Sequence, residues 1–404
     1  MNETTRGCGI CDVRDSRVLH RMEFSMPIES PLPDRYDIVA CAGCGFVYAD
    51  TPAAQQDYDV HYTDFSRYED AAVASGGGDA GYDALRLSAA GSWLASQLSA
   101  TASIADVGCG NGGLLDALSE LGFSKLTKLT GIELAPGCLA NLREKGYIAR
   151  GGSIRRLPVD LSGSFDVVLL SHVMEHVVDL KDSLTSARSL LKPGGLVYIE
   201  TPDASRYAGL SLVPFYFFDP EHINHFDVNS LTNLCGSVGL SVVNSGQRDF
   251  ALPSGQPYPA TFVLAHFDGR ISTIQREDSL EEAVRTYITE SHDRDFAPGL
   301  EALQASGRPI VMWGAGSEAQ RILQRMGDAH GRLVAVVDRD ATKHGRVLYG
   351  CTITTPEVGL VGVPTDAVLL IAAALVAPAI REEFLSMGVP LPVVLPWEPV
   401  ENAL

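Results

Sequence analysis

Two pairs of cysteines near the beginning of the sequence have the spacing of a metal site, because Cys8-x2-Cys11 and Cys41-x2-Cys44 are separated by 29 residues. Each pair forms a turn that directs two thiolates at one ion. The tight backbone of these turns would come from Gly9, Gly43 and Gly45. Four thiolates complete the tetrahedron around Zn²⁺ and leave no position open for water, which predicts a structural zinc site rather than a catalytic one. A thiolate that accepts methyl groups is the alternative.

An aromatic segment further along the chain carries residues suited to proton transfer. Residues 216–226 read Y-F-F-D-P-E-H-I-N-H-F, which places Glu221 beside His222 and puts His225 three positions later. Imidazole titrates near neutral pH, so either histidine could act as a general base in a partly dry pocket. A base is needed where a hydroxyl, or a carbon next to a ketone, must lose its proton to react. The alternative is a histidine that only packs against a strand-to-helix turn.

A glycine-rich stretch lies between the cysteines and this segment. Residues 104–113 read I-A-D-V-G-C-G-N-G-G, and residues 114–121 have the pattern of a helix. Glycines at such a turn let backbone amides approach a ligand where a Cβ would collide. A strand, a glycine loop and a helix in this order form the cofactor site of open α/β sheets. An ordinary tight turn without a ligand is the alternative.

The segments that follow have the pattern of further strands in the same sheet. Residues 129–133 form a short strand that ends in Glu133, an acid placed to accept hydrogen bonds from a ribose diol. Residues 165–170 form a buried strand that leads into S-H-V-M-E-H. Pro193 and the two glycines after it predict that a helix stops within residues 190–195, before residues 196–200 resume the sheet.

These motifs together resemble a class I S-adenosylmethionine-dependent methyltransferase over roughly residues 85–245: D-V-G-C-G-N-G, G-I-E, F-D-V-V, and H-V-M-E-H followed by L-K-P-G-G. The resemblance implies that Gly108 and Gly110 lie against the methionine part of the cofactor and that Glu133 holds the ribose. The cofactor-binding residues expected from it are Asp106, Gly108, Gly110, Asn111, Glu133, Ser153, Ile154, Ser171 and His172. A dehydrogenase is the alternative for the loop alone, because its glycines also satisfy G-x-G-x-x-G.

A second nucleotide-type unit is predicted near the end of the chain. Residues 309–313 form a strand, G-A-G-S-E-A begins at Gly314, and a helix follows. A second strand, residues 333–337, ends in Asp338, and residues 367–371 form a further parallel strand, which fits a Rossmann-like unit. Its loop could bind a dinucleotide or a diphosphate, or it could bind nothing. The basic residues available to a diphosphate are Arg339, Lys343 and Arg346.

The order of these units is similar to that of the sugar C-methyltransferases, which methylate nucleotide-linked keto-deoxysugars. The likeness implies an α/β protein with a zinc-binding module at residues 1–75, a class I methyltransferase Rossmann-like domain at residues 76–265, and a helical linker with a second Rossmann-like domain at residues 266–404. Glu221 and His222 match the family's glutamate and its candidate enolising base. The family's tyrosine two positions before the glutamate falls here on Asp219.

The function implied by this resemblance is base-assisted C-methylation of a nucleotide-linked deoxysugar, with S-adenosylmethionine as the cofactor and zinc in a structural role. Methylation of an oxygen, a nitrogen or a carboxylate on another natural product is an alternative with the same cofactor. A non-catalytic protein that binds zinc and a nucleotide is an alternative of another class. An oxidoreductase that uses the loop at Gly314 is a further one.

The composition limits the partners and the location. The chain has 404 residues, a formal net charge of −19, 46% hydrophobic and 20% charged residues, which is typical of a globular protein with more than one domain. This charge repels nucleic acids and anionic membranes, so we expect a small-molecule acceptor. The first residues are polar and lack the apolar core of a signal peptide, which predicts a cytoplasmic location. Four aromatic residues follow the zinc module and are expected to pack against the domain, with the lining of an active-site entrance as the alternative: Tyr58, Tyr62, Phe65 and Tyr68.

Overall fold

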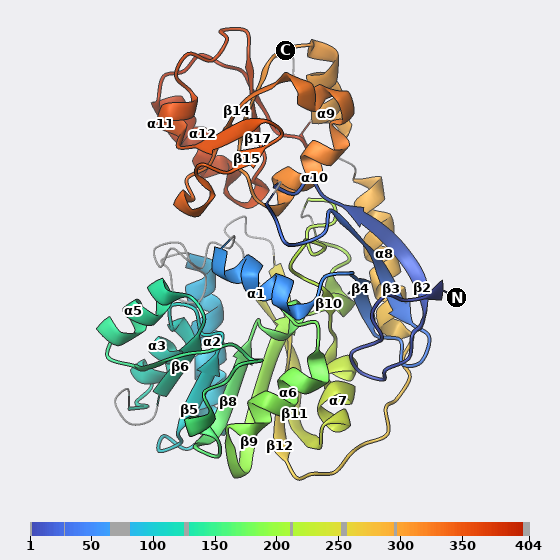
Figure 1. Cartoon of the computed structure of the whole chain (residues 1–404), viewed down its shortest axis with the longest axis vertical. Coiled ribbons are helices and arrows are strands. Elements are labelled where there is room, and N and C mark those ends of the chain that lie inside the picture. The colour runs from blue at the N-terminus through green and yellow to red at the C-terminus, as the bar shows by residue number, and fades with distance from the viewer. Residues whose placement is uncertain are drawn as a thin grey trace.

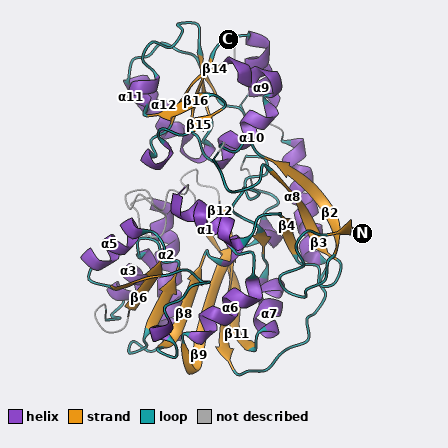
Figure 2. Cartoon of the chain, in the orientation of Figure 1, coloured by secondary structure: helices purple, strands orange, loops and turns teal. Residues whose placement is uncertain are grey.

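Three β-sheets organise the chain in the computed structural model, and helices lie on their faces (Figure 1, Figure 2). The structure describes residues 2–27, 29–64, 81–124, 129–210, 213–251, 257–294 and 297–398. The predicted aromatic residues Phe65 and Tyr68 lie outside the described residues. The cysteine pairs, the first glycine loop and the second glycine loop each belong to a different sheet.

The central sheet has seven strands in the order β11-β12-β9-β8-β5-β6-β7. Its parallel strands are β5 (Ile104–Val107), β6 (Leu129–Glu133), β7 (Ile148–Gly151), β8 (Phe165–Ser171) and β9 (Leu191–Pro202). Two antiparallel strands complete one edge, β11 (Leu240–Ala251) and β12 (Pro257–Phe267). The chain continues from β5 to β6 on one side and returns to β8 on the other. Open α/β sheets bind ligands at this position, beyond the carboxyl ends of the two strands.

Helices cover both faces of the central sheet, which explains why β5, β6 and most of β8 are buried on both sides. One face packs against α2 (Gly81–Gln97), α3 (Gly113–Glu120) and α5 (Pro136–Glu144), and the other packs against α6 (Leu180–Ser189) and α7 (Val228–Ser237). Within β5, Ile104 belongs to the first core and Ala105 to the second. The predicted strands at residues 129–133 and 165–170 and the predicted helix at residues 114–121 are confirmed within one residue.

The predicted helix stop is confirmed, but the predicted start of the next strand at residue 196 is wrong. Helix α6 ends at Ser189, and β9 begins at Leu191, so Pro193 lies inside the strand rather than after a helix. Leu191 pairs with Phe165, and the register of β8 and β9 then shifts, which leaves room for an irregular first turn of the strand. A proline near the beginning of a strand removes no ladder hydrogen bond that the sheet needs.

The N-terminal sheet is antiparallel and includes a short strand from much later in the chain. Its order is β1 (Asn2–Glu3), β2 (Asp15–Glu23), β3 (Arg35–Cys41), β4 (Val47–Asp50) and β10 (Asn224–His225). Asn224 pairs with Tyr48, and His225 pairs with Val47. The segment with the predicted catalytic residues is therefore held by the cysteine-containing module.

The C-terminal sheet has six strands in the order β15-β16-β14-β13-β17-β18. The parallel strands are β13 (Ile310–Trp313), β14 (Leu333–Val337), β16 (Cys351–Thr354), β17 (Val368–Ile371) and β18 (Val393–Val394), and β15 (Val347–Leu348) is antiparallel. The helices of this unit are α9 (Ala297–Ser306), α10 (Ser317–Arg325), α11 (Pro356–Gly359) and α12 (Ala377–Ser386). The predicted strands of this unit are confirmed within one residue.

Helix α8 (Ser279–Asp293) lies in the predicted helical linker, but it packs with the first two units. Leu280, Val284 and Tyr287 enter the core shared by the N-terminal module and the central domain. Figure 1 shows this helix beside β2 and β3. Among the described helices, none is long and apolar enough to cross a membrane.

A substitution at Gly45 tests how closely the N-terminal module packs against the segment at Glu277. Its φ of 82° is left-handed, and a Cβ there would collide with the carbonyl oxygen of Glu277. Gly209 has a similar φ of 79° with open space around its Cβ position. We expect Gly209→Ala to cost about 1–2 kcal/mol of folding free energy from backbone strain alone. Gly45→Ala should cost clearly more, as measured by urea unfolding, and equal losses would contradict the close contact.

Candidate functional site

The four cysteines predicted as zinc ligands come together in the N-terminal module. Their Sγ atoms all lie within 4.8 Å of one another, and the Cys8–Cys44 and Cys11–Cys41 sulfur pairs are 3.6 Å and 3.3 Å apart. All four are free thiols rather than disulfides. Zn–S bonds of about 2.3 Å place tetrahedral sulfurs about 3.8 Å apart, so this set fits a tetrathiolate zinc ion. Binding of zinc stays a prediction.

Gly9 lies in the first cysteine turn, as predicted, but the turn does not require the left-handed backbone of a glycine there. Gly9 has no left-handed backbone; instead, a Cβ there would lie 2.9 Å from the side chain of Leu180 in α6. Asp12 takes the left-handed conformation of the first cysteine turn, with φ of 63°, and Gly45 takes that of the second. The first cysteine turn therefore packs directly against the central domain.

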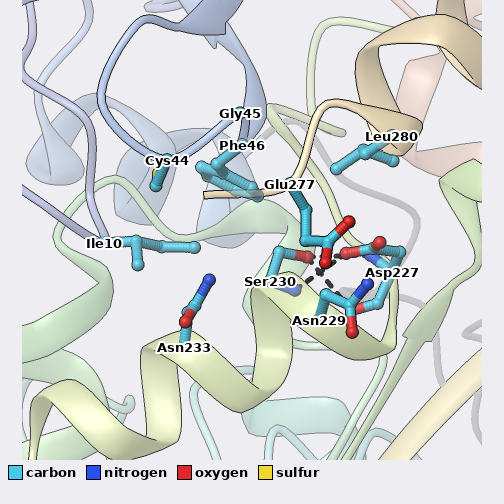
Figure 3. A pocket seen from close by; sticks show the side chains of 10 residues that line it. All are labelled: Ile10, Cys44, Gly45, Phe46, Asp227, Asn229, Ser230, Asn233, Glu277 and Leu280. Atoms are coloured by element: carbon cyan, nitrogen blue, oxygen red, sulfur yellow. Dashed lines mark hydrogen bonds between the residues drawn. The ribbon is translucent and has the colours of Figure 1, made fainter. Parts of the chain in front are cut away.

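A cavity of about 10 Å³ lies beside Cys44, between the N-terminal module and α7 (Figure 3). In Figure 3 the Glu277 side chain points toward the first turn of α7, where Asp227 and Ser230 form a reciprocal capping box. A volume of this size holds about one water molecule. The cavity is too small for a cofactor or an acceptor and marks a packing boundary.

The first glycine loop is held by the acid at the end of β6. Gly108 and Gly110 have left-handed φ values of 71° and 51°. The backbone amide of Gly110 donates to Glu133 Oε2 at 2.9 Å, and the amides of Leu134 and Ala135 donate to Oε1 at 2.6 Å and 3.1 Å. The carboxylate of Glu133 thus fixes the loop as well as the end of its own strand. Its contact with a ribose stays a prediction.

Asp106 and Arg86 are two buried charged residues near the first glycine loop. Burial, and then the neighbouring Glu133 carboxylate, raise the pKa of Asp106 to about 8, while Arg86 acts to lower it. Arg86 Nη1 donates to Ser171 Oγ at 2.9 Å and lies 3.3 Å from Glu200 Oε1. Sequence reasoning missed Arg86, because the pattern of α2 identified only its apolar positions. This arginine lies beside the end of β8, while Lys145 Nζ donates to the carbonyl oxygen of Asn111 in the loop itself at 2.8 Å.

The remaining predicted cofactor residues lie around the same edge of the sheet. The side-chain oxygen of Asn111 accepts a hydrogen bond from Asn141 Nδ2 at 2.9 Å, which directs it toward α5. Gly152 donates its amide to the Glu133 carbonyl at 3.0 Å, so residues 152–154 begin beside the end of β6. Ser153 Oγ is buried without a hydrogen-bond partner among the described residues, and Ile154 is buried in the core. Their contacts with the cofactor stay predictions.

The turn after β8 brings several ionisable groups together. His172 has a left-handed φ of 55°, unusual for a residue with a side chain, and its Nδ1 lies 3.1 Å from Glu175 Oε1. Glu175 is 1% exposed. Burial acts to raise the pKa of Glu175, but His172, then His176 and His222, outweigh burial and hold that pKa at about 2. A buried carboxylate therefore stays ionised among three imidazoles.

The loop that carries the predicted base lies against this turn. The rings of His176 and His222 have centroids 4.7 Å apart, and His176 Nδ1 lies 3.1 Å from the carbonyl oxygen of Glu221. The Glu221 carboxylate contacts His61 Nε2 at 3.1 Å, and His61 holds the pKa of Glu221 below its usual range against the effect of burial. Asp219 Oδ1 accepts the backbone amides of Glu221 and His222 at 2.9 Å and 2.8 Å. Asp219 therefore shapes the loop.

The structure separates the two predicted bases. His222 lies beside His176 and is partly exposed. His225 is 0% exposed, with Phe218 and Tyr207 packed against its ring at centroid distances of 4.8 Å and 6.0 Å. Burial is the main cause that lowers the pKa of His225 to about 3. His225 therefore stays neutral, and an acceptor has no access to it.

The C-terminal loop places its predicted basic residues against acids. Lys343 Nζ lies 3.0 Å from Asp338 Oδ2 and 3.4 Å from Asp340 Oδ2. Asp338 Oδ2 also accepts the backbone amide of Ala315 at 2.7 Å. Arg339 pairs with Glu357 and Glu383. A diphosphate at this loop would have to compete with these carboxylates.

Comparison with known proteins finds a methyltransferase domain in the middle of the chain. A model of the methyltransferase domain matches residues 82–245. The chain is 36% identical over 108 residues to the ubiquinone biosynthesis O-methyltransferase of Xanthomonas axonopodis pv. citri (strain 306), which covers 25% of this chain and 44% of that relative. The protein of the same name from Xanthomonas oryzae pv. oryzae (strain PXO99A) is 34% identical over 108 residues, with the same coverage. The chain spans less than half the length of these curated relatives.

Two solved structures are similar to part of this chain at low identity. The Burkholderia thailandensis 1,6-didemethyltoxoflavin-N1-methyltransferase, with 1,6-didemethyltoxoflavin and S-adenosylhomocysteine bound, has a TM-score of 0.42 and 19% identity, over 56% of this chain and 96% of that chain. An S-adenosylmethionine-dependent methyltransferase from Mesorhizobium loti has a TM-score of 0.35 and 19% identity, over 45% of this chain and 99% of that chain.

Cys41→Ser tests the zinc assignment. Loss of one thiolate opens the tetrahedron, so we expect bound zinc to fall from about one ion per chain to a small fraction, with a lower melting temperature. Cys351→Ser, in the C-terminal sheet, is the matched control and should keep the metal. Elemental analysis and calorimetry measure both effects. Equal zinc content in both variants would refute the assignment.

Asp106→Asn tests the buried acid below the glycine loop. The folded-state pKa of about 8 lies above the ordinary value, so this group stabilises the fold least once it is ionised. Its destabilising effect therefore grows as the pH rises toward about 8 and stays constant above that. We expect the stability advantage of Asp106→Asn over the natural chain to grow by about 2–3 kcal/mol between pH 6 and pH 9, as measured by urea unfolding without S-adenosylmethionine. A stability difference that does not change with pH would contradict the burial of an ionisable Asp106.

Proposed function

We propose that this chain, whose residues 82–245 form a class I S-adenosylmethionine-dependent methyltransferase domain, transfers the methyl group of that cofactor to a small molecule beside His222. One observation carries the proposal. A Cβ on Gly108 would lie 2.9 Å from Val173, in the turn that leads to Glu175. The predicted cofactor loop and the histidine cluster therefore meet at the carboxyl ends of β5 and β8.

The reaction is an in-line displacement at the cofactor's methyl group. The S–CH₃ bond breaks, its electron pair stays on sulfur to leave S-adenosylhomocysteine, and a lone pair or carbanion of the acceptor forms the new bond. The acceptor atom loses its proton to the imidazole of His222. Positioning of the acceptor against the methyl group supplies most of the rate, and the base supplies the rest where a proton must leave.

The residues around the glycine loop would hold the cofactor. Gly108 and Gly110 would lie against its methionine part, and Glu133 against its ribose. Arg86 would add a cation for the methionine carboxylate, since its guanidinium reaches Ser171 at the end of β8. In the N-terminal module, zinc would hold the turn between β3 and β4. Strand β4 in turn pairs with β10, which follows His222 in the chain.

A nucleotide-linked keto-deoxysugar, methylated on carbon after enolisation, is the acceptor class we propose. The arrangement of a cysteine module, a methyltransferase domain and a parallel C-terminal sheet supports it. Helix α10 of the C-terminal unit also contacts the acceptor segment, because Arg321 Nη1 donates to the carbonyl oxygen of Phe218 at 3.1 Å. Lys343 lies 4.0 Å from the Cβ position of Gly316, next to the C-terminal loop.

Methylation of a hydroxyl on another small molecule is the second candidate. The 36% identity to an enzyme named as a ubiquinone biosynthesis O-methyltransferase supports it over a quarter of the chain. The pairing of Lys343 and Arg339 with acids also favours an acceptor without a diphosphate. Both candidates use the same base and the same cofactor.

Product analysis separates the candidates. The purified protein, incubated with methyl-labelled S-adenosylmethionine and either nucleotide-linked keto-deoxysugars or free phenols and hydroxy acids, should form one labelled product and an equal amount of S-adenosylhomocysteine. Mass spectrometry locates the label on carbon or oxygen. The absence of cofactor binding by calorimetry would refute the proposal itself.

His222→Asn tests the base. We expect turnover to fall about 10²–10⁴-fold while the cofactor dissociation constant changes less than about twofold, because the imidazole acts only on the acceptor. His330→Asn, at a partly exposed position of the C-terminal unit, is the control and should keep full turnover. Turnover of His222→Asn at the level of the control would show that another group takes the proton.

A further inference from the structure

We infer that Glu175, His176 and His222 form a binding site for a divalent first-row transition-metal ion at the acceptor side of the central domain. The inference rests on the proposed function, since it concerns the same cluster. Each residue offers one ligand atom, and the three atoms lie within 4.8 Å of one another. Two imidazoles and one carboxylate are a ligand set that binds zinc and iron in open catalytic sites.

The carboxylate has the environment of an unoccupied ligand. Glu175 is 1% exposed, and neither of its oxygens accepts a hydrogen bond of good geometry among the described residues. The nearest groups are imidazole nitrogens, His172 Nδ1 at 3.1 Å and His176 Nε2 at 3.9 Å. A buried carboxylate without donors is costly unless a cation compensates it. This feature is independent of the clustering itself.

The first histidine is oriented as metal ligands usually are. Its Nδ1 lies 3.1 Å from the carbonyl oxygen of Glu221, which can only accept, so Nδ1 carries the proton and Nε2 is free to bind an ion. Such an outer hydrogen bond fixes the tautomer of a metal-bound imidazole. The Nδ1 of His222 is buried without a hydrogen-bond partner, 3.9 Å from Asp219 Oδ2.

Closing the set around one ion needs a small movement. Bonds of about 2.1 Å bring ligand atoms to about 3–3.5 Å from one another, so the set must contract by roughly 1 Å. His222 is the residue able to move, because its side chain is 22% exposed and lies on a loop. Three protein ligands leave positions open for the acceptor.

An ion at this position would bind the oxygen of a hydroxyl or of an enol and favour its deprotonated form. His222 would then be a ligand rather than a free base. The proton of the acceptor would leave to solvent, and the methyl transfer would otherwise proceed with the same bonds broken and formed. The metal therefore changes how the acceptor is activated, not which group is transferred.

Manganese binding tests the site apart from turnover. Mn²⁺ prefers oxygen and nitrogen donors to four thiolates, so the cysteine cluster can keep its zinc during the titration. Loss of the aqueous Mn²⁺ signal in electron paramagnetic resonance should reveal one site per chain. Spin-echo modulation should show imidazole nitrogen bound to the ion. Glu175→Gln should weaken the site at least about tenfold, whereas Glu144→Gln, at an exposed position on α5, should not.

Two further measurements keep the test decisive. If Glu175→Gln fails to fold, as judged by its melting transition, the partly exposed His222→Asn tests the same site and should lose the nitrogen modulation. Zinc analysis of every variant should show an unchanged cysteine site. The inference is overturned if the natural chain binds no Mn²⁺, Co²⁺ or Zn²⁺ beyond the cysteine site, or if both variants bind like the natural chain. Product formation without any of these ions would leave the proposed function standing and His222 as its base.

Discussion

The pairing of β10 with β4 is the interaction on which the candidate site depends. Only two residues of β10, Asn224 and His225, make this pairing. It joins the segment that carries His222 to the β3–β4 hairpin, in which Cys41 is the last residue of β3 and Cys44 lies in the turn. Neighbouring hydrogen bonds extend the contact, from the amide of Ala49 to the carbonyl of Ile223 at 2.9 Å and from the Tyr36 hydroxyl to the carbonyl of Asp219 at 2.7 Å. Each buried hydrogen bond contributes about 1 kcal/mol, so the set fixes the loop against thermal motion. The cysteine module therefore supports the loop that carries the candidate site.

The central domain could be predicted from the sequence because its signals are local. A buried strand, a glycine turn and an apolar helix face each occupy a few consecutive residues, and their order along the chain sets the order of the sheet. The four cysteines were equally readable, since two short spacings define two turns. What failed was positional detail, such as Pro193 in a strand and Gly9 against Leu180, because both depend on neighbours from distant segments.

The histidine cluster could be predicted only in part. Glu221, His222 and His225 were identified from one segment, but their partners come from elsewhere: His61 from α1 (Gln55–Asp64), and Glu175 and His176 from the turn after β8. A two-residue strand such as β10 leaves no periodic pattern, so the sequence has no signal for the pairing that assembles these groups. For the same reason the sequence did not separate His222 from His225. Burial decides between them, and burial belongs to the tertiary structure.

Charge is what distinguishes the two acceptor classes. The carboxyl edge of the central sheet carries buried acids, Glu133 and Glu200 among them, which would suit the proposed cofactor with its cationic sulfonium. The C-terminal loop also offers no free positive charge from Lys343, because Asp338 and Asp340 pair with this lysine. A diphosphate that binds there must break these ion pairs and is repelled by a protein with a net charge of −19. Both effects weaken its binding. A neutral hydroxylated acceptor meets neither cost, so a nucleotide-linked sugar requires the C-terminal unit to rearrange its ion pairs when it binds.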